Sequence, residues 1–541
     1  MDESIFSLLF NRFPKSVSFF SVTFAVFCCV SLIIYWALPS RHRYKALLVS
    51  SVVFYLFFPW WFALFLLFST VTSYFIARAI TKIDRSQKVY LENNKDLTSD
   101  EKKAFKAKNK KKKKGLMIVG ILSVLILLVV MKYTDFIIDN INGISSWFGA
   151  NKIEHLNLIL PLGISFYTFQ IIGYLADVYW SKYEAESNFL RYCLFIVFFP
   201  KIMQGPIIRY NEMKDELFAD KKFDYTTFTD GLKRLAYGFF KKIVIADCLS
   251  VFVNWAFDNV AGLSGSTAFC ALIAYMIQDY CDFSGYMDIT IGIAMCFGIK
   301  MPENFCRPYF ARTIPEYWRR WHITLGTWFK DYIFYPISMS KFSRKLGGVS
   351  KKIFGPSGKV VPAIFGLVIV WFSTGLWHGA SWNYVLWGMY YGLIIILGIA
   401  FEPLFAKIKA KLHIDTERPA FRIFQHVRTI LLLMIGRVLF MSNSVPDAIM
   451  FIGRIFTSWN NFDCSVIGNE VSLCVSMGMF AIVLVVDIIQ ERRPDNSFCD
   501  KLAKRRLPVR WSMYLLLIAV IIVFGFYGTG LPVVEFGYVH F

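Results

Sequence analysis

The sequence predicts an all-α membrane protein that crosses the bilayer many times. Of its 541 residues, 56% are hydrophobic and 18% aromatic, whereas only 18% are charged. The mean hydropathy of +0.48 is higher than soluble proteins of this size usually show. The apolar residues form repeated runs of about 20 residues, the length that a helix needs to cross a bilayer. We therefore expect one integral-membrane domain over residues 1–541.

The positive charge of the chain is distributed as in the cytoplasmic loops of membrane proteins. The formal net charge is +21, but Lys and Arg lie between the apolar runs rather than in one basic domain, so we expect no nucleic-acid partner. The most basic segment is 81–114, which carries nine Lys from Lys102 to Lys114. We interpret it as a cytoplasmic loop that is too highly charged to fold alone. A patch that binds anionic lipid or nucleic acid is the alternative.

The apolar runs predict about twelve full spans, beginning at 17–37 and ending at 511–526, and two partial ones. The first partial segment, 190–206, is interrupted by Pro200, Lys201 and Gly205. The second, 322–337, is too short to span, so we expect re-entrant or tilted helices at both places. All strongly basic loops fall on one side in this topology. It predicts a multi-pass plasma-membrane protein, surrounded by lipid, with both termini outside the cytoplasm.

The stretch 302–337 (PENFCRPYFARTIPEYWRRWHITLGTWFKDYIFYPI) carries more ionisable groups than a lipid-facing helix tolerates. It should therefore face protein, water or a ligand, with His322 at its centre. Its cations could hold the phosphates of a coenzyme A at the cytoplasmic side, or they could equally be cytoplasmic topology markers. These cations are Arg307, Arg312, Arg319, Arg320 and Lys330.

A second stretch with a single histidine, 374–388 (TGLWHGASWNYVLWG), is the expected partner of the first. A neutral imidazole in a water-poor tunnel can accept a proton from a hydroxyl, the step that acyl transfer from a thioester requires. We expect no metal, because HxxxH and HExxH spacings are absent. For the acidic residues Asp282 and Asp288, which lie in an apolar run, a helix cap or an interhelical hydrogen bond is an equal alternative to a functional role. The other residues expected to line the tunnel or support it are Trp321, Trp377, Asn383, Asp282 and Asp288.

These two histidine stretches and FSGYMD at 283–288 resemble the membrane-bound O-acyltransferase (MBOAT) superfamily, most closely its bacterial alginate O-acetylation branch. The resemblance extends over 165–392, which would form the core of the fold. It implies a ring of helices around a central tunnel, a catalytic histidine at His378 and a second family histidine at His322. The tail 535–541 (EFGYVHF) is similar to the aromatic tail of this group but differs at Gly537 and His540.

The resemblance implies an enzyme that moves an acetyl group from cytoplasmic acetyl-CoA across the membrane for O-acetylation of a cell-surface polysaccharide. An extracytoplasmic, esterase-like acetyltransferase partner would complete the transfer to the polymer. D-alanyl transfer for teichoic acid modification, the activity of the sister branch, is the alternative within the family. From the residues alone, a transporter or channel with both histidines in a polar path is a further alternative, and so is a purely structural membrane scaffold.

Overall fold

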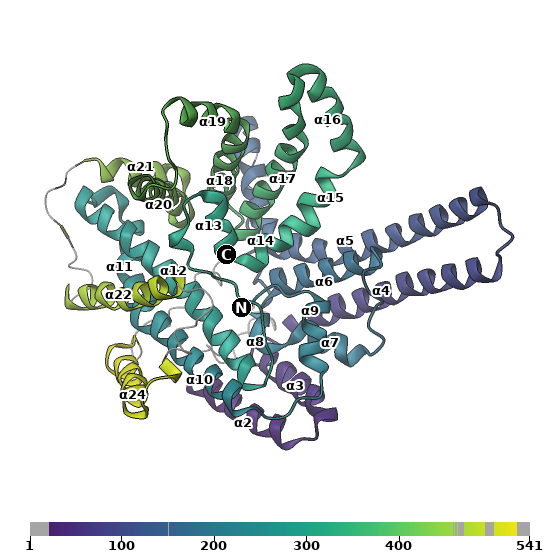
Figure 1. Cartoon of the computed structure of the whole chain (residues 1–541), viewed down its shortest axis with the longest axis horizontal. Coiled ribbons are helices and arrows are strands. Elements are labelled where there is room, and N and C mark those ends of the chain that lie inside the picture. Colours follow the sequence, from purple (N-terminus) through teal and green to yellow (C-terminus); the bar gives the residue numbers. More distant parts are fainter. Residues whose placement is uncertain are drawn as a thin grey trace. The chain divides into compact units, whose positions relative to one another are not determined.

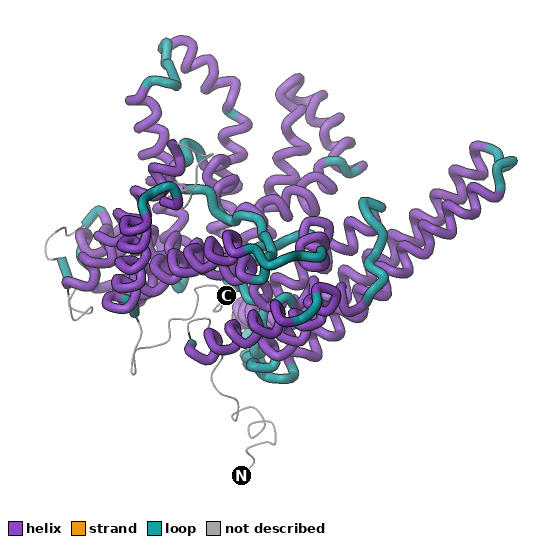
Figure 2. The backbone as a smooth tube through the Cα atoms, turned by 60° about the horizontal axis from the view of Figure 1, so that its bottom comes forward, coloured by secondary structure: helices purple, strands orange, loops and turns teal. Residues whose placement is uncertain are grey.

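The computed structural model describes residues 21–149, 151–457, 459, 462–463, 470–492 and 502–526, and helices form its regular structure (Figures 1 and 2). Seven of these helices are long and apolar enough to cross a membrane, which confirms the predicted all-α, multi-pass fold class. The tail at 535–541 and both termini lie outside the described residues. The seven are α4 (Phe62–Asn93), α5 (Ser99–Ser145), α17 (Val361–His378), α18 (Trp382–Ala400), α20 (Pro419–Met441), α22 (Glu470–Arg492) and α24 (Leu507–Phe524).

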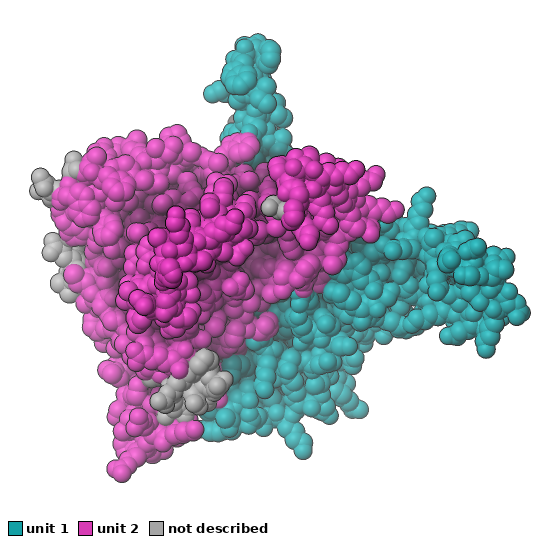
Figure 3. Space-filling model, turned by 45° about the horizontal axis from the view of Figure 1, so that its top comes forward, with its two compact units in different colours: residues 1–229, 293–301 teal, residues 230–292, 302–541 magenta. Residues whose placement is uncertain are grey.

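The chain divides into two compact units, which Figure 3 shows in different colours. The first contains residues 1–229 and 293–301, and the second contains 230–292 and 302–541. Both histidine stretches belong to the second unit, so its helices determine the geometry of the candidate site.

The first unit is built from α4 and α5, which lie side by side (Figure 1), and from shorter helices. Segment 190–206 forms two short buried helices rather than one span, as its Pro and Gly residues predicted. The shorter helices are α2 (Val22–Ala37), α3 (Ser40–Tyr55), α6 (Ile164–Tyr179), α7 (Phe189–Val197), α8 (Phe199–Ile202) and α9 (Tyr210–Phe218).

The expectation that segment 81–114 forms a loop was wrong. Helix α4 continues to Asn93 and α5 begins at Ser99, so only the short turn between them is not helical. Thr98 and Glu101 form a capping box at the start of α5, and lysine is a good helix former whose charges remain in water. Lys113 also reaches Asp84 on α4, with 2.6 Å between Nζ and Oδ1. The cytoplasmic location of this segment stays a prediction.

The second unit begins within α10 (Tyr225–Phe239), which continues through the π-helix η2 (Phe240–Ala246) into α11 (Asp247–Asp258). Helix α12 (Gly265–Cys296) packs against this segment so closely that a Cβ at Gly238 would lie 2.7 Å from the Gly285 carbonyl oxygen. The helices that follow are α13 (Ile314–Arg320), α14 (Ile323–Phe329), η5 (Lys330–Phe334), α15 (Tyr335–Ser338), α16 (Lys341–Phe354), α19 (Glu402–Lys411) and α21 (Val445–Ile455), with α17, α18, α20, α22 and α24 completing the unit.

Helices α17 and α18 form the hairpin that carries the second histidine stretch. Their backbones are in contact at two glycines: a Cβ at Gly375 would lie 2.5 Å from the Tyr384 carbonyl oxygen, and a Cβ at Gly388 would collide with the Trp371 carbonyl oxygen. Larger side chains would therefore push the two helices apart. This close approach fixes His378, the last residue of α17, against the side chains of α18.

Candidate active site

His322 lies between α13 and α14, at a point where the backbone adopts an unusual conformation. Its φ angle is +47°, in the left-handed region that residues other than glycine rarely adopt. An antiparallel bridge between Phe305 and Trp321 holds the segment in place. The backbone N–H of Ile323 also donates to the Asn304 carbonyl oxygen at 3.0 Å. Backbone strain of this kind is often found at functional sites, where surrounding contacts maintain it.

The imidazole of His322 is buried, with 2% of the residue exposed. Its Nδ1 lies 3.2 Å from Nδ2 of Asn304, and the ring of Phe283 packs edge-on at a centroid distance of 4.8 Å. Among the described residues, no atom forms a hydrogen bond with Nε2, which is itself buried. Position 322 lies outside the seven helices that are long and apolar enough to cross a membrane, and burial lowers the pKa of His322 to about 3. The ring is therefore neutral at physiological pH.

His378 is buried among aromatic rings from three helices. Its ring centroid lies 4.8 Å from that of Trp377 on α17, 4.7 Å from that of Trp387 on α18 and 5.3 Å from that of Phe440 on α20. Only 3% of the residue is exposed. These rings exclude water from the imidazole, which strengthens electrostatic interactions with any group bound beside it.

Trp377 connects the two histidines. Its ring centroid lies 5.8 Å from that of His322 and 4.8 Å from that of His378. The structure thus brings two residues from separate segments of the sequence into contact with the same ring, and their partnership in one site stays a prediction. We call His322, His378 and Trp377, with the rings that surround them, the histidine cluster.

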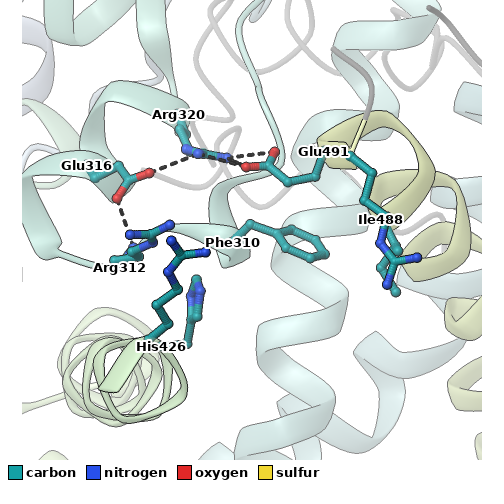
Figure 4. Close-up of a pocket in the computed structure, with 9 residues that line it drawn as sticks. Phe310, Arg312, Glu316, Arg320, His426, Ile488 and Glu491 are labelled. Atoms are coloured by element: carbon teal, nitrogen blue, oxygen red, sulfur yellow. Dashed lines mark hydrogen bonds and ion pairs between the residues drawn. The ribbon is translucent and has the colours of Figure 1, made fainter. Parts of the chain in front are cut away.

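A cavity of about 770 Å³ in the second unit is lined by several cationic side chains (Figure 4). We call it the basic pocket. Arg320 donates to Glu316 at 2.8 Å and to both carboxylate oxygens of Glu491 at 2.9 Å, as the dashed lines in Figure 4 show. Four arginines and two glutamates line the cavity, and Glu417 also pairs with Arg312 and Arg422. The four arginines still outnumber these three carboxylates, so the pocket suits an anionic ligand. The lining residues are Phe310, Arg312, Glu316, Arg320, Arg422, His426, Ile488, Glu491 and Arg492.

The five cations predicted to hold a donor occupy different places. Arg312 and Arg320 line the basic pocket. Arg307 lies beside it, because its Nε pairs with the pocket residue Glu491 at 2.6 Å. Arg319 and Lys330 are exposed and do not line the cavity. The structure therefore groups three of the five around one cavity.

The predicted polar residues Asp282, Asp288 and Asn383 all join helices. Asp282 on α12 pairs with Lys242 of η2 at 2.5 Å. Asp288 pairs with Lys241 at 2.5 Å. The amide of Asn383 donates to the Ser442 carbonyl oxygen at 2.8 Å. These contacts match the interhelical alternative for the two aspartates, and a role in lining a tunnel stays a prediction.

Sequence reasoning missed a buried arginine beneath the predicted Trp321. Arg437 on α20 pairs with Asp279 on α12 at 2.5 Å and donates to the Tyr317 hydroxyl at 2.8 Å. Its guanidinium carbon also lies 4.4 Å from the centroid of the Trp321 ring. One signal was available, because an arginine inside an apolar run indicates a buried partner. Asn304, Arg422, His426 and Arg492 were missed as well, and for these the sequence offered no comparable signal.

The sequence of this chain is similar to a protein family model and to several known proteins. The sequence model for MBOAT, the membrane-bound O-acyltransferase family, matches residues 185–446, which include both histidines. A probable alginate O-acetylase of Pseudomonas syringae is 29% identical over 87% of this chain and 82% of its own length. One of Pseudomonas putida is 31% identical over 80% of this chain and 78% of its own. A peptidoglycan O-acetyltransferase of Helicobacter pylori is 36% identical over 53% of this chain and 55% of its own.

Proposed function

Because the chain belongs to the membrane-bound O-acyltransferase family, we propose that it uses acetyl-CoA from the cytoplasm to O-acetylate a cell-surface polysaccharide. The family makes it a multi-pass membrane O-acyltransferase. The acetyl group and the polysaccharide are supported by relatives named as alginate O-acetylases and a peptidoglycan O-acetyltransferase. The observation that carries the proposal is the histidine cluster, in which Trp377 contacts two buried imidazoles.

His378 is the general base in this proposal. The oxygen of an acceptor hydroxyl attacks the carbonyl carbon of the thioester, and the neutral imidazole takes the hydroxyl proton. The tetrahedral intermediate then collapses and the carbon–sulfur bond breaks. The thiolate leaves with the proton that the imidazolium returns, so the products are an acetyl ester and free coenzyme A. The surrounding rings of Trp387 and Phe440 keep competing water away.

The basic pocket is the proposed binding place for the phosphates of the donor. A guanidinium group presents paired N–H donors that match phosphate oxygens. Arg320 is held in position by Glu316 and Glu491, whereas Arg492 makes no ion pair with any residue that the structure describes. Arg320 also lies only two positions before His322 in the chain. A donor held at this pocket would therefore be anchored by the segment that carries His322.

The final acceptor is proposed to be reached through an extracytoplasmic, esterase-like partner. This assignment rests on the resemblance to the alginate O-acetylation branch. The partner would receive the acetyl group on a hydroxyl and pass it to the polymer. The identity of the polymer would then depend on the partner.

The experiment that tests the proposed function measures release of free thiol from acetyl-CoA by the purified chain in detergent or liposomes. The same preparation is assayed with and without extracytoplasmic proteins of the source cell. Thiol release that depends on the chain supports acyl transfer. A chain that releases no thiol under either condition, but that lets a solute cross sealed liposomes, would instead be a transporter or channel.

A further inference from the structure

The side-chain amide of Asn304 has a fixed orientation. The residue is fully buried, and its Oδ1 accepts hydrogen bonds from the backbone N–H of Thr324 at 3.0 Å and from the Thr324 hydroxyl at 2.9 Å. A backbone N–H can only donate, so the atom facing it must be the oxygen. The amide nitrogen is thereby turned to the other side.

On that side the amide nitrogen faces His322. Nδ2 of Asn304 lies 3.2 Å from Nδ1 of His322 and 3.3 Å from the sulfur of Met287. The Asn304 oxygen is also 3.3 Å from Nδ1, but it already accepts the two hydrogen bonds from Thr324. The N–H of Asn304 therefore donates to Nδ1, and the single proton of the neutral ring is located on Nε2.

This tautomer leaves a buried N–H group that needs an acceptor. No described residue accepts a hydrogen bond from Nε2 of His322, and a buried donor without a partner is unfavourable. The left-handed backbone at His322 and the edge-on ring of Phe283 hold the imidazole in one orientation. The ring of Trp377 packs against both this ring and that of His378. An oxygen atom bound in the histidine cluster would satisfy the donor.

We propose that Asn304 is a positioning residue that holds His322 as the Nε2–H tautomer, so that His322 donates a hydrogen bond to the carbonyl oxygen of the thioester. This inference rests on the proposed function and assigns different roles to the two histidines. His378 takes and returns the proton of the acceptor hydroxyl. His322 keeps its proton throughout and stabilises the negative charge that develops on the carbonyl oxygen. Atoms and charge balance without any further reactant.

The variant His322→Gln distinguishes between two roles for this residue, that of a hydrogen-bond donor and that of a general base. A glutamine amide can donate a hydrogen bond but cannot accept a proton at neutral pH. We expect His322→Ala to lower kcat for thiol release about 10²–10³-fold and His322→Gln to recover a substantial part of that loss, with the KM for acetyl-CoA little changed. If His322→Gln and His322→Ala lose activity equally while the wild-type chain is active, His322 is not a hydrogen-bond donor and the inference is overturned.

The variant Asn304→Asp tests the positioning role. The introduced carboxylate can still accept both hydrogen bonds from Thr324, so the local backbone contacts are retained, but it removes the N–H that faces His322. The neutral ring would then carry its proton on Nδ1 and present a lone pair at Nε2. Protonation of the ring at lower pH would restore the Nε2–H. The side chains that the described part of the chain places against the ring, Phe283 on α12, Trp377 on α17 and Asn304, are all uncharged.

The expected readout is the ratio of the kcat of Asn304→Asp to that of the wild type across pH. The ratio should rise as pH falls, because protonation returns the donor that the substitution removed. A ratio that rises with pH would mean that Nε2 acts as a base, and a ratio that does not change would mean that Asn304 has no influence on the ring; either result overturns the inference. Absence of thiol release by the wild-type chain would instead contradict the proposed function.

Discussion

Replacing Arg437 by Met should destabilise the second unit strongly, because it leaves a carboxylate buried without its cation. Arg437 is 3% exposed and Asp279 is 8% exposed, and their charged atoms are 2.5 Å apart. Breaking a buried ion pair from one side costs about 3–5 kcal/mol. The lost cation–π contact with Trp321 would add about 1–2 kcal/mol. The double variant Arg437→Met, Asp279→Asn also removes the unpaired carboxylate charge, so it should recover most of the lost stability.

The assay is thermal unfolding of the purified chain in detergent, followed by tryptophan fluorescence. Because a chain of 541 residues does not unfold in one step, the comparison uses the order of the midpoints rather than a free energy. We predict that Arg437→Met melts well below the wild type and that the double variant melts above Arg437→Met. The reasoning is refuted if Arg437→Met melts with the wild type, or if adding Asp279→Asn lowers the midpoint further.

Two further predictions concern helix packing and the basic pocket. Gly388→Ala should lower the unfolding midpoint, because the new methyl group collides with the Trp371 carbonyl oxygen and costs about 1–3 kcal/mol. Gly398→Ala on the same helix has open space, so an equal loss there would contradict this explanation. Arg492→Gln should raise the KM for acetyl-CoA roughly 10–100-fold with kcat little changed, since it removes one charged donor to phosphate. The exposed Arg344→Gln is the control, and an equal KM shift there would exclude a specific role for the pocket.

The fold class was predictable because membrane-spanning helices are encoded by local composition. Runs of apolar residues identified the helices, and the breaks at Pro200 and Gly205 identified a segment that does not span. The same local reasoning failed at 81–114, where it counted charges but ignored the capping box of Thr98 and Glu101. A few local hydrogen bonds and good helix formers were enough to continue two helices through a highly charged sequence.

The candidate site was predictable only in part. His322 and His378 stand out because ionisable residues are rare in apolar runs, and the structure places both against Trp377. The residues that orient them depend on contacts across the fold. Asn304 meets His322 from 18 positions earlier in the chain, and Arg437 meets Asp279 from a different helix. Spacing along a sequence does not reveal such pairs.

The most direct test of the central claim is acetyl transfer by His378→Ala. The variant should still fold, with a midpoint below that of the wild type because a buried ring is lost, and should release thiol from acetyl-CoA about 10²–10⁴-fold more slowly, because it lacks the general base. The exposed His155→Ala provides the matched control and should keep the wild-type rate. A folded His378→Ala protein that releases thiol as fast as the wild type would contradict the proposed mechanism.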